Sequence, residues 1–171
     1  MPSLLCCPIP VFDPAAALRD AHSAKTAGAD LIEFRLDDFF HGDESQIAQI
    51  VDVISNSPLP CIATCRPTEG GEGGSYDGPD DARISLFERL GTAFGKGEHP
   101  PRYIDVELAT YDRSANIRQK INLAIDHPEQ VRDLQTSLIL STHDFKGLPP
   151  DLSRDGPAGP RVAPSSPPET R

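Results

Sequence analysis

The sequence is poor in basic residues, and this shortage limits the partners that the protein can have. Sixteen lysines and arginines stand against 26 aspartates and glutamates, which gives the 171-residue chain a formal charge of −10. Nucleic acids and anionic membrane surfaces are themselves negative, so neither is expected as a main partner. A small anionic substrate is not excluded, because its binding depends on local arginines and not on net charge.

Long apolar segments are also missing. No run approaches the ~18 apolar residues that a transmembrane helix requires. The opening stretch "MPSLLCCPIPVF" is too short and too interrupted by proline for a signal peptide. These features lead us to expect a cytoplasmic protein.

Motifs for metals and nucleotides are absent as well. The four cysteines lie in apolar, strand-like runs without a CxxC pair, and their spacing to the histidines does not match a zinc site. We interpret them as buried, reduced thiols. There is no Walker or dinucleotide fingerprint, so nucleotide binding has no support.

What the sequence does contain is a regular alternation of two patterns. Short apolar runs near residues 4–12, 31–37, 61–66, 103–108 and 137–141 alternate with amphipathic, helix-like segments at 14–28, 46–56, 80–94 and 115–134. Repeated βα units predict a parallel sheet, either doubly wound or rolled into a (β/α)8 barrel. Polar residues gather at the carboxyl ends of several different strands, which favours the barrel.

A complete barrel needs eight units and ~250 residues, whereas this chain offers about five units. We therefore predict an α/β fold, a partial (β/α)8 TIM barrel formed by residues 1–146. Residues 147–171 hold seven prolines and three glycines and show no helical or strand period. This segment is predicted to be an unstructured tail or a foreign terminus.

One histidine stands where a barrel enzyme places its catalytic groups. His143 follows the apolar run "LILS" and precedes Asp144. An imidazole exchanges protons near neutral pH, and the end of a strand fixes its position. A surface or capping histidine would explain the same position equally well.

Two arginines end neighbouring strands and suggest an anionic ligand. Arg35 and Arg66 could converge on a carboxylate, which a guanidinium binds through two parallel hydrogen bonds. The alternative is that each closes a salt bridge, Arg35 with Glu33 or Asp37. The glycine-rich stretch "TEGGEGGSYDG" that follows Arg66 is a loop.

These pieces together resemble the type I 3-dehydroquinate dehydratases of the shikimate pathway. The resemblance covers roughly residues 4–146 and rests on an ordered set of motifs, each weak alone. The motifs are "EFRLD" (Glu33–Asp37), "TCRP" with "EGG" (Thr64–Gly74), "IDVEL" (Ile104–Leu108) and "STHDF" (Ser141–Phe145).

The resemblance implies a barrel enzyme that converts 3-dehydroquinate to 3-dehydroshikimate and water without metal or cofactor. In this family a lysine forms a Schiff base with the substrate ketone, and a histidine moves the proton. The resemblance assigns His143 to that histidine and assigns Glu33, Arg35 and Arg66 to substrate binding. A loop glutamate supports the histidine, and both Glu69 and Glu72 fit that role.

The chain departs from the family at the Schiff-base lysine, which ends the strand after the one with the histidine. None of its lysines, Lys25, Lys96, Lys120 and Lys146, ends a sixth strand. We therefore expect a C-terminally truncated member that is inactive alone, through a premature stop or a frameshift near residues 147–151. The alternative is a non-catalytic carboxylate-binding or assembly protein of the same fold. The choice between monomer and homodimer stays open.

Overall fold

The computed structural model describes residues 3–70, 73–94, 99–132 and 134–145. It has five parallel strands in one sheet, in the order β1-β2-β3-β4-β5. The strands are β1 (Cys6–Pro10), β2 (Leu31–Arg35), β3 (Cys61–Thr64), β4 (Tyr103–Glu107) and β5 (Ser137–Ser141). The helices are α1 (Pro14–Thr26), α2 (Glu44–Ser55), α3 (Asp80–Thr92), α4 (Leu108–Tyr111) and α5 (Ala115–Arg132).

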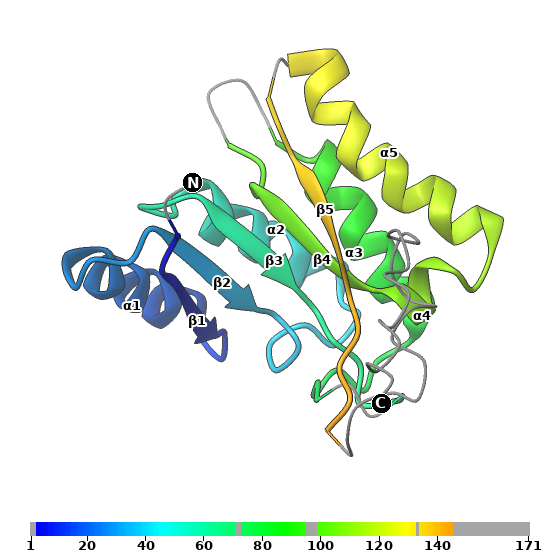
Figure 1. Cartoon of the computed structure of the whole chain (residues 1–171), viewed down its shortest axis with the longest axis horizontal. Helices are drawn as coiled ribbons and strands as arrows, with labels where there is room; N and C mark the ends of the chain where they lie inside the picture. Colours follow the sequence, from blue (N-terminus) through cyan, green and yellow to red (C-terminus); the bar gives the residue numbers. More distant parts are fainter. Residues whose placement is uncertain (1–2, 71–72, 95–98, 133, 146–171) are drawn as a thin grey trace, which may run out of the picture.

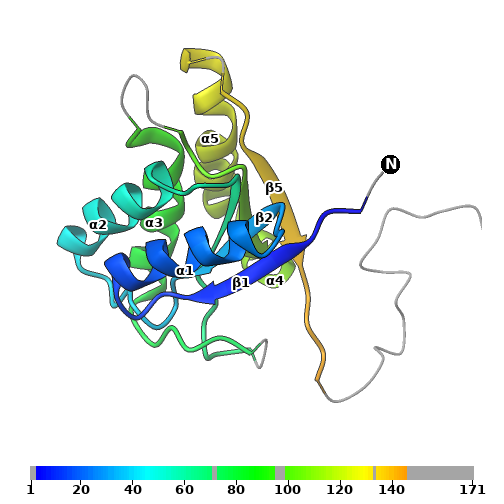
Figure 2. The same cartoon turned by 90° about the vertical axis from the view of Figure 1, so that its left-hand side faces the viewer.

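The predicted succession of βα units is confirmed. Each strand pairs in parallel with the next one along the chain, and α1, α2, α3 and α5 lie on one side of the sheet (Figures 1 and 2). The short helix α4 was not predicted, because it continues directly from the apolar strand β4. The predicted tail, with Lys146, lies outside the described residues.

Two helices begin where the sequence supplies a side-chain cap. The carboxylate of Asp13 accepts a hydrogen bond from the backbone N–H of Ala16 at 2.7 Å, and Pro14 occupies the first helical turn of α1. The Asp43 carboxylate accepts from Ser45 N–H at 2.8 Å at the start of α2. Both caps satisfy donors that a helix terminus would otherwise leave unpaired.

Alternation along β2 separates a core face from a polar face. Ile32 and Phe34 are fully buried, whereas Glu33 and Arg35 are half-buried. Successive side chains of a strand point to opposite faces of the sheet, so Glu33 and Arg35 share the face opposite Ile32 and Phe34. The hydrophobic core therefore lies between the sheet and the helices, and the polar pair lies on the other face.

The first strand contains two prolines because it is an edge strand. Its neighbour β2 forms hydrogen bonds with the residues that flank β1: the Leu31 N–H donates to the Leu5 carbonyl, and the Val11 N–H donates to the Arg35 carbonyl. Backbone groups alternate in direction along a strand, so Pro8 and Pro10 turn away from β2. A proline lacks the N–H, and at these two positions no bond to β2 is lost.

Helices α3 and α5 pack closely at a glycine. A Cβ atom added to Gly91 would lie 2.0 Å from the Ala124 carbonyl oxygen and 2.4 Å from the Ala124 Cα. Backbone atoms cannot yield as a flexible side chain can. Gly91 therefore fixes how near α5 comes to α3.

We predict that Gly91→Ala destabilises the fold by about 1–3 kcal/mol, the cost of overpacking a tight contact. Chemical unfolding monitored by circular dichroism measures the change. The sign is diagnostic, because alanine in an uncrowded helix would add about 0.5–1 kcal/mol of stability. A variant as stable as the parent chain would contradict the close packing of α3 on α5.

Candidate active site

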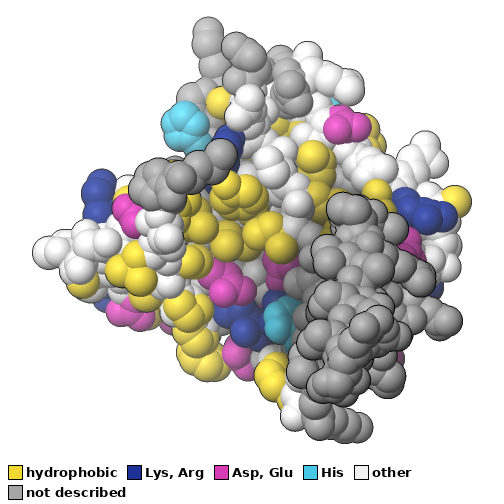
Figure 3. Space-filling model, viewed as in Figure 1, with side chains coloured by type: hydrophobic (Ala, Val, Ile, Leu, Met, Phe, Trp, Pro, Cys, Tyr) yellow, Lys and Arg dark blue, Asp and Glu magenta, His cyan; other side chains and the backbone are white. Residues whose placement is uncertain are grey.

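Strand register brings polar residues of three strands into one row. Arg35 of β2 pairs with Thr64 of β3, and Thr64 pairs with Asp105 of β4. Residues in register on a parallel sheet point to the same face, so these side chains share the face opposite the helices. On this face, hydrophobic side chains cover the centre, and acidic and basic side chains gather with a histidine toward the carboxyl ends of the strands (Figure 3).

On β2, both candidate residues contact neighbouring protein groups. The Thr64 hydroxyl donates to the Glu33 carboxylate at 2.9 Å. Arg35 forms the salt bridge that its sequence context left open: Nε and Nη2 donate to the two carboxylate oxygens of Asp37, at 3.0 and 2.9 Å. Arg35 Nη2 also donates to the Gly73 carbonyl at 3.2 Å. The guanidinium therefore links β2 to the loop between β3 and α3.

Asp37 is held in its ionised form by these contacts. Burial alone would raise its pKa, but the hydrogen bond and charge of Arg35 and the hydroxyl of Ser75 lower that pKa below its usual value of 3.8. The Ser75 N–H and Oγ donate to the same carboxylate oxygen of Asp37 at 3.1 and 2.9 Å. Asp37 thus anchors the β3–α3 loop beside β2.

The second arginine is also paired with an acid. Arg66 Nη2 lies 2.6 Å from the Asp105 carboxylate, and both side chains are more than nine-tenths buried. In the described part of the chain, Arg66 Nε and Asp105 Oδ1 are buried without a hydrogen-bond partner. The pair therefore has one donor (Arg66 Nε) and one acceptor (Asp105 Oδ1) that form no hydrogen bond within the described residues.

A third arginine, whose role the sequence did not predict, reaches from α3 to the carboxyl ends of β3 and β4. Arg83 of α3 is fully buried, and its Nη1 donates to the Cys65 carbonyl at 3.1 Å and to Glu107 at 2.7 Å. Its Nη2 donates to Thr110 and to Asp80 at 2.9 and 3.0 Å. This guanidinium joins β3, β4, α3 and α4. The available signal was an arginine at helical spacing (i+3, i+4 and i+7) from the apolar residues Leu86, Phe87 and Leu90.

His143 lies just after β5, where the sequence predicted it, and it is half-buried. Its ring is stacked near the Phe145 ring, with centroids 6.4 Å apart. A Cβ added to Gly73 would come within 2.8 Å of the Phe145 ring, so the β3–α3 loop closely approaches the segment after β5. The loop that contacts Arg35 thus also reaches the segment that carries His143.

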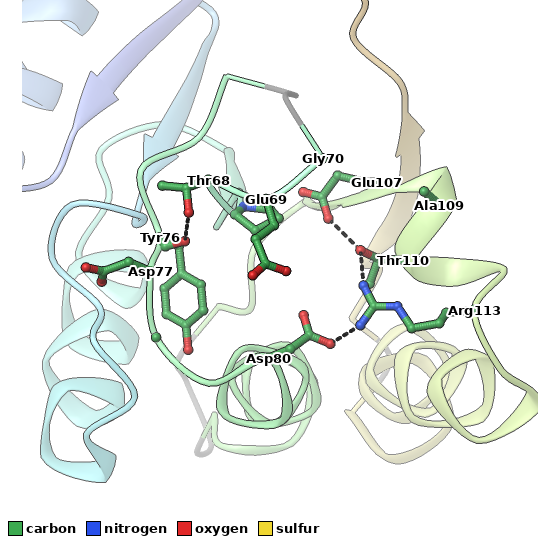
Figure 4. A pocket seen from close by; sticks show the side chains of 12 residues that line it. Thr68, Glu69, Gly70, Tyr76, Asp77, Asp80, Glu107, Ala109, Thr110 and Arg113 are labelled. Atoms are coloured by element: carbon green, nitrogen blue, oxygen red, sulfur yellow. Dashed lines mark hydrogen bonds and ion pairs between the residues drawn. The ribbon is translucent and has the colours of Figure 1, made fainter.

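Of the two glutamates that could support His143, the structure describes only one. Glu72 lies outside the described residues. Glu69 is exposed, and its carboxylate points into a cavity of about 480 Å³ between the β3–α3 loop and α4 (Figure 4). Its role beside His143 stays a prediction.

The prediction that all four cysteines are buried thiols is only partly confirmed. All four cysteines are free, but Cys6 and Cys7 are half-buried, because they lie at the edge strand, and only Cys61 and Cys65 are buried. Burial raises the pKa of Cys61 to about 12, so this thiol is unreactive at neutral pH.

Within the described ranges, no group of three acidic, histidine or cysteine side chains could hold a metal ion. No described helix has the length and apolar character needed to cross a bilayer.

The fold and the site define a class of protein: a part of a (β/α)8 barrel whose polar side chains gather at the carboxyl ends of its strands. A family model, described as type I 3-dehydroquinase, matches residues 5–154. The chain belongs to the type I 3-dehydroquinase family. The expected resemblance and the partial-barrel fold are thereby confirmed.

The curated relatives are much longer than the segment that aligns with this chain. The 3-dehydroquinate dehydratase of Methanosarcina mazei is 31% identical over 134 residues, which cover 78% of this chain and 49% of the relative. The chloroplastic bifunctional 3-dehydroquinate dehydratase/shikimate dehydrogenase of Arabidopsis thaliana is 30% identical over 155 residues, 91% of this chain and 22% of the relative. The chain thus spans at most about half the length of these curated relatives.

Solved structures agree on the fold. The type I 3-dehydroquinate dehydratase of Clostridium difficile, crystallised with covalently modified comenic acid, has a TM-score of 0.66 at 24% identity. The match covers 85% of this chain and 53% of that structure. The Geobacillus kaustophilus 3-dehydroquinate dehydratase has a TM-score of 0.64 at 23% identity, with 85% and 52% covered. At such identities the likeness establishes the fold alone.

We predict that Arg83→Leu destabilises the protein by about 3–5 kcal/mol, because it leaves the buried Glu107 carboxylate without its cation. Urea unfolding measures the loss. The double variant Arg83→Leu/Glu107→Leu is the matched control, and it should lose clearly less than the single variant. A single variant that loses no more than the double variant would contradict the assignment of Arg83 as the partner of Glu107.

Proposed function

We propose that this chain carries the substrate-contacting and proton-transferring part of a 3-dehydroquinate dehydratase site. The observation that carries the proposal is the family match over residues 5–154. The reaction is the elimination of water from 3-dehydroquinate to give 3-dehydroshikimate, within aromatic amino acid biosynthesis. The substrate is a small molecule, and no metal or organic cofactor enters this scheme.

In this proposal His143 is the proton-transferring residue. It takes a proton from the carbon next to the substrate ketone and returns one to the departing hydroxyl, so that water leaves. Its half-buried position at a strand end supports this role, because a fixed imidazole exchanges protons near neutral pH. Glu69 or Glu72 would orient the imidazole.

Glu33, Arg35 and Arg66 are the proposed substrate-binding residues. Since Arg35 and Arg66 already face carboxylates of their own, their charge is largely compensated. A paired arginine and acid together suit a hydroxyl group, which accepts from the one and donates to the other. We therefore assign these residues to the substrate hydroxyls. This compensation also weakens the alternative of a non-catalytic carboxylate-binding protein.

The amine that forms the Schiff base has no candidate among the described lysines. Such an amine must be neutral to attack the ketone, which requires desolvation or a nearby cation to lower its pKa. Lys146, three positions after His143, lies outside the described residues. A solvated lysine keeps a pKa of about 10.4 and is almost wholly protonated at neutral pH. We therefore propose that the 171-residue chain alone is inactive.

We predict that the purified chain does not dehydrate 3-dehydroquinate at an enzyme-like rate. Without the iminium the substrate carbon is a weak acid, and removal of its proton by His143 should be slow. The assay is the rise in absorbance of the conjugated product. Turnover in the parent chain that is lost in Lys146→Ala would contradict the prediction and would identify Lys146 as the nucleophile.

A further inference from the structure

Ser75 fastens the β3–α3 loop to the residues that follow β2. Its N–H and Oγ donate to one carboxylate oxygen of Asp37 at 3.1 and 2.9 Å, and the same Oγ is shared with the Asp38 carboxylate at 2.7 Å. Hydrogen bonds to an ionised acceptor are stronger than those between neutral groups. An exposed serine of a glycine-rich loop is therefore held in a fixed position beside β2.

The carboxylate that binds Ser75 also binds Arg35. Asp37 is 2% exposed, and its two oxygens accept from Arg35 Nε and Nη2. Two parallel bonds of this kind fix the plane of the guanidinium. The remaining nitrogen, Arg35 Nη1, forms no hydrogen bond within the described residues, and the side chain is 23% exposed. Asp37 thus determines which edge of Arg35 is left for a ligand.

The backbone of the same loop approaches the segment after β5. The Gly73 carbonyl accepts from Arg35 Nη2 at 3.2 Å, and a Cβ added to Gly73 would lie 2.8 Å from the Phe145 ring. Gly73 has a φ of 76°, in the left-handed region that favours glycine. The Phe145 ring is in turn stacked near His143. The loop position that Ser75 fixes therefore extends to the residue proposed for proton transfer.

The residues on either side of Ser75 pack against the backbone of Arg66. The Tyr76 N–H donates to the Arg66 carbonyl at 3.1 Å. A Cβ added to Gly74 would lie 2.1 Å from that carbonyl oxygen, so a larger residue does not fit there without a backbone shift. A displacement of Ser75 would therefore disturb the backbone that carries Arg66 as well as the contacts of Arg35.

We infer that Ser75 is a positioning residue of the proposed dehydratase site. Through Asp37 it fixes the free edge of Arg35, and through the loop backbone it fixes the approach of Gly73 to the segment that carries His143. Because Ser75 acts through these neighbours, its role rests on the proposed function. A hydroxyl is required at this position, since the backbone N–H cannot replace the bonds made by Oγ.

The first test compares the ligand-free chain with three variants, through the ¹H–¹⁵N NMR signals of Arg35 Nε and of the His143 imidazole. Ser75→Ala removes the hydroxyl and should shift both signals, whereas Ser75→Thr keeps the hydroxyl and should restore them. Ser23→Ala is the matched control, since the exposed Ser23 donates to the Arg19 carbonyl within α1 at 3.0 Å. Parent-like signals in Ser75→Ala, or equal shifts in all three variants, would overturn the role of Ser75.

The second test is the affinity for 3-dehydroquinate. We expect Ser75→Ala to weaken binding by about fivefold, because Arg35 is then less well oriented before the ligand arrives. Ser75→Thr and Ser23→Ala should stay within about twofold of the parent chain, because both leave the orientation of Arg35 unchanged. Equal affinity of Ser75→Ala and the parent would contradict the role of Ser75 alone. A parent chain that does not bind 3-dehydroquinate would contradict the proposed function itself, and the positioning role with it.

Discussion

The Arg83 guanidinium holds together the part of the molecule on which the site depends. It is fully buried, and it bonds to the backbone after β3, to the end of β4 and to α4. A buried guanidinium is tolerated only when its donors are matched, and here Glu107 supplies the opposite charge. Because Cys65 precedes Arg66, the same contacts set the backbone from which Arg66 reaches Asp105.

The candidate site is built of paired charges. Arg35 faces Asp37, Arg66 faces Asp105, and Arg83 faces Glu107. Each pair fixes the direction of a side chain before any ligand arrives, which lowers the cost of ordering the site. The pairs also leave little uncompensated positive charge, so the arrangement suits hydroxyl groups better than a free carboxylate.

Much of the fold was readable from the sequence, because it depends on local patterns. The alternation in "LIEFR" separates Ile32 and Phe34 from Glu33 and Arg35, and Asp13 before Pro14 marks the start of α1. The repeated βα units indicated a parallel sheet, and the polar residues at the strand ends favoured the barrel, whose neighbouring strands follow one another along the chain, as they do here. His143 lies just after β5, at the carboxyl end of the sheet, as expected.

The side-chain pairs could be predicted from the sequence less well than the fold. The Arg35–Asp37 salt bridge was one of two alternatives, and the sequence could not choose between them. Arg66 and Asp105 lie 39 positions apart, and Arg83 and Glu107 lie 24 apart. Such pairs depend on how strands and helices pack, and no local period encodes them. Glu69 could not be assigned to the cavity for the same reason.

The most direct test is whether the substrate reaches His143 without forming a covalent bond. The measurement is the imidazole ¹H–¹⁵N signal of His143 during titration with 3-dehydroquinate, with the mass of the chain recorded after borohydride reduction. We expect the His143 signal to move saturably while the mass stays unchanged. A His143 signal that does not respond, or a mass increased by one reduced substrate, would contradict the proposal that this chain binds the substrate without forming a Schiff base.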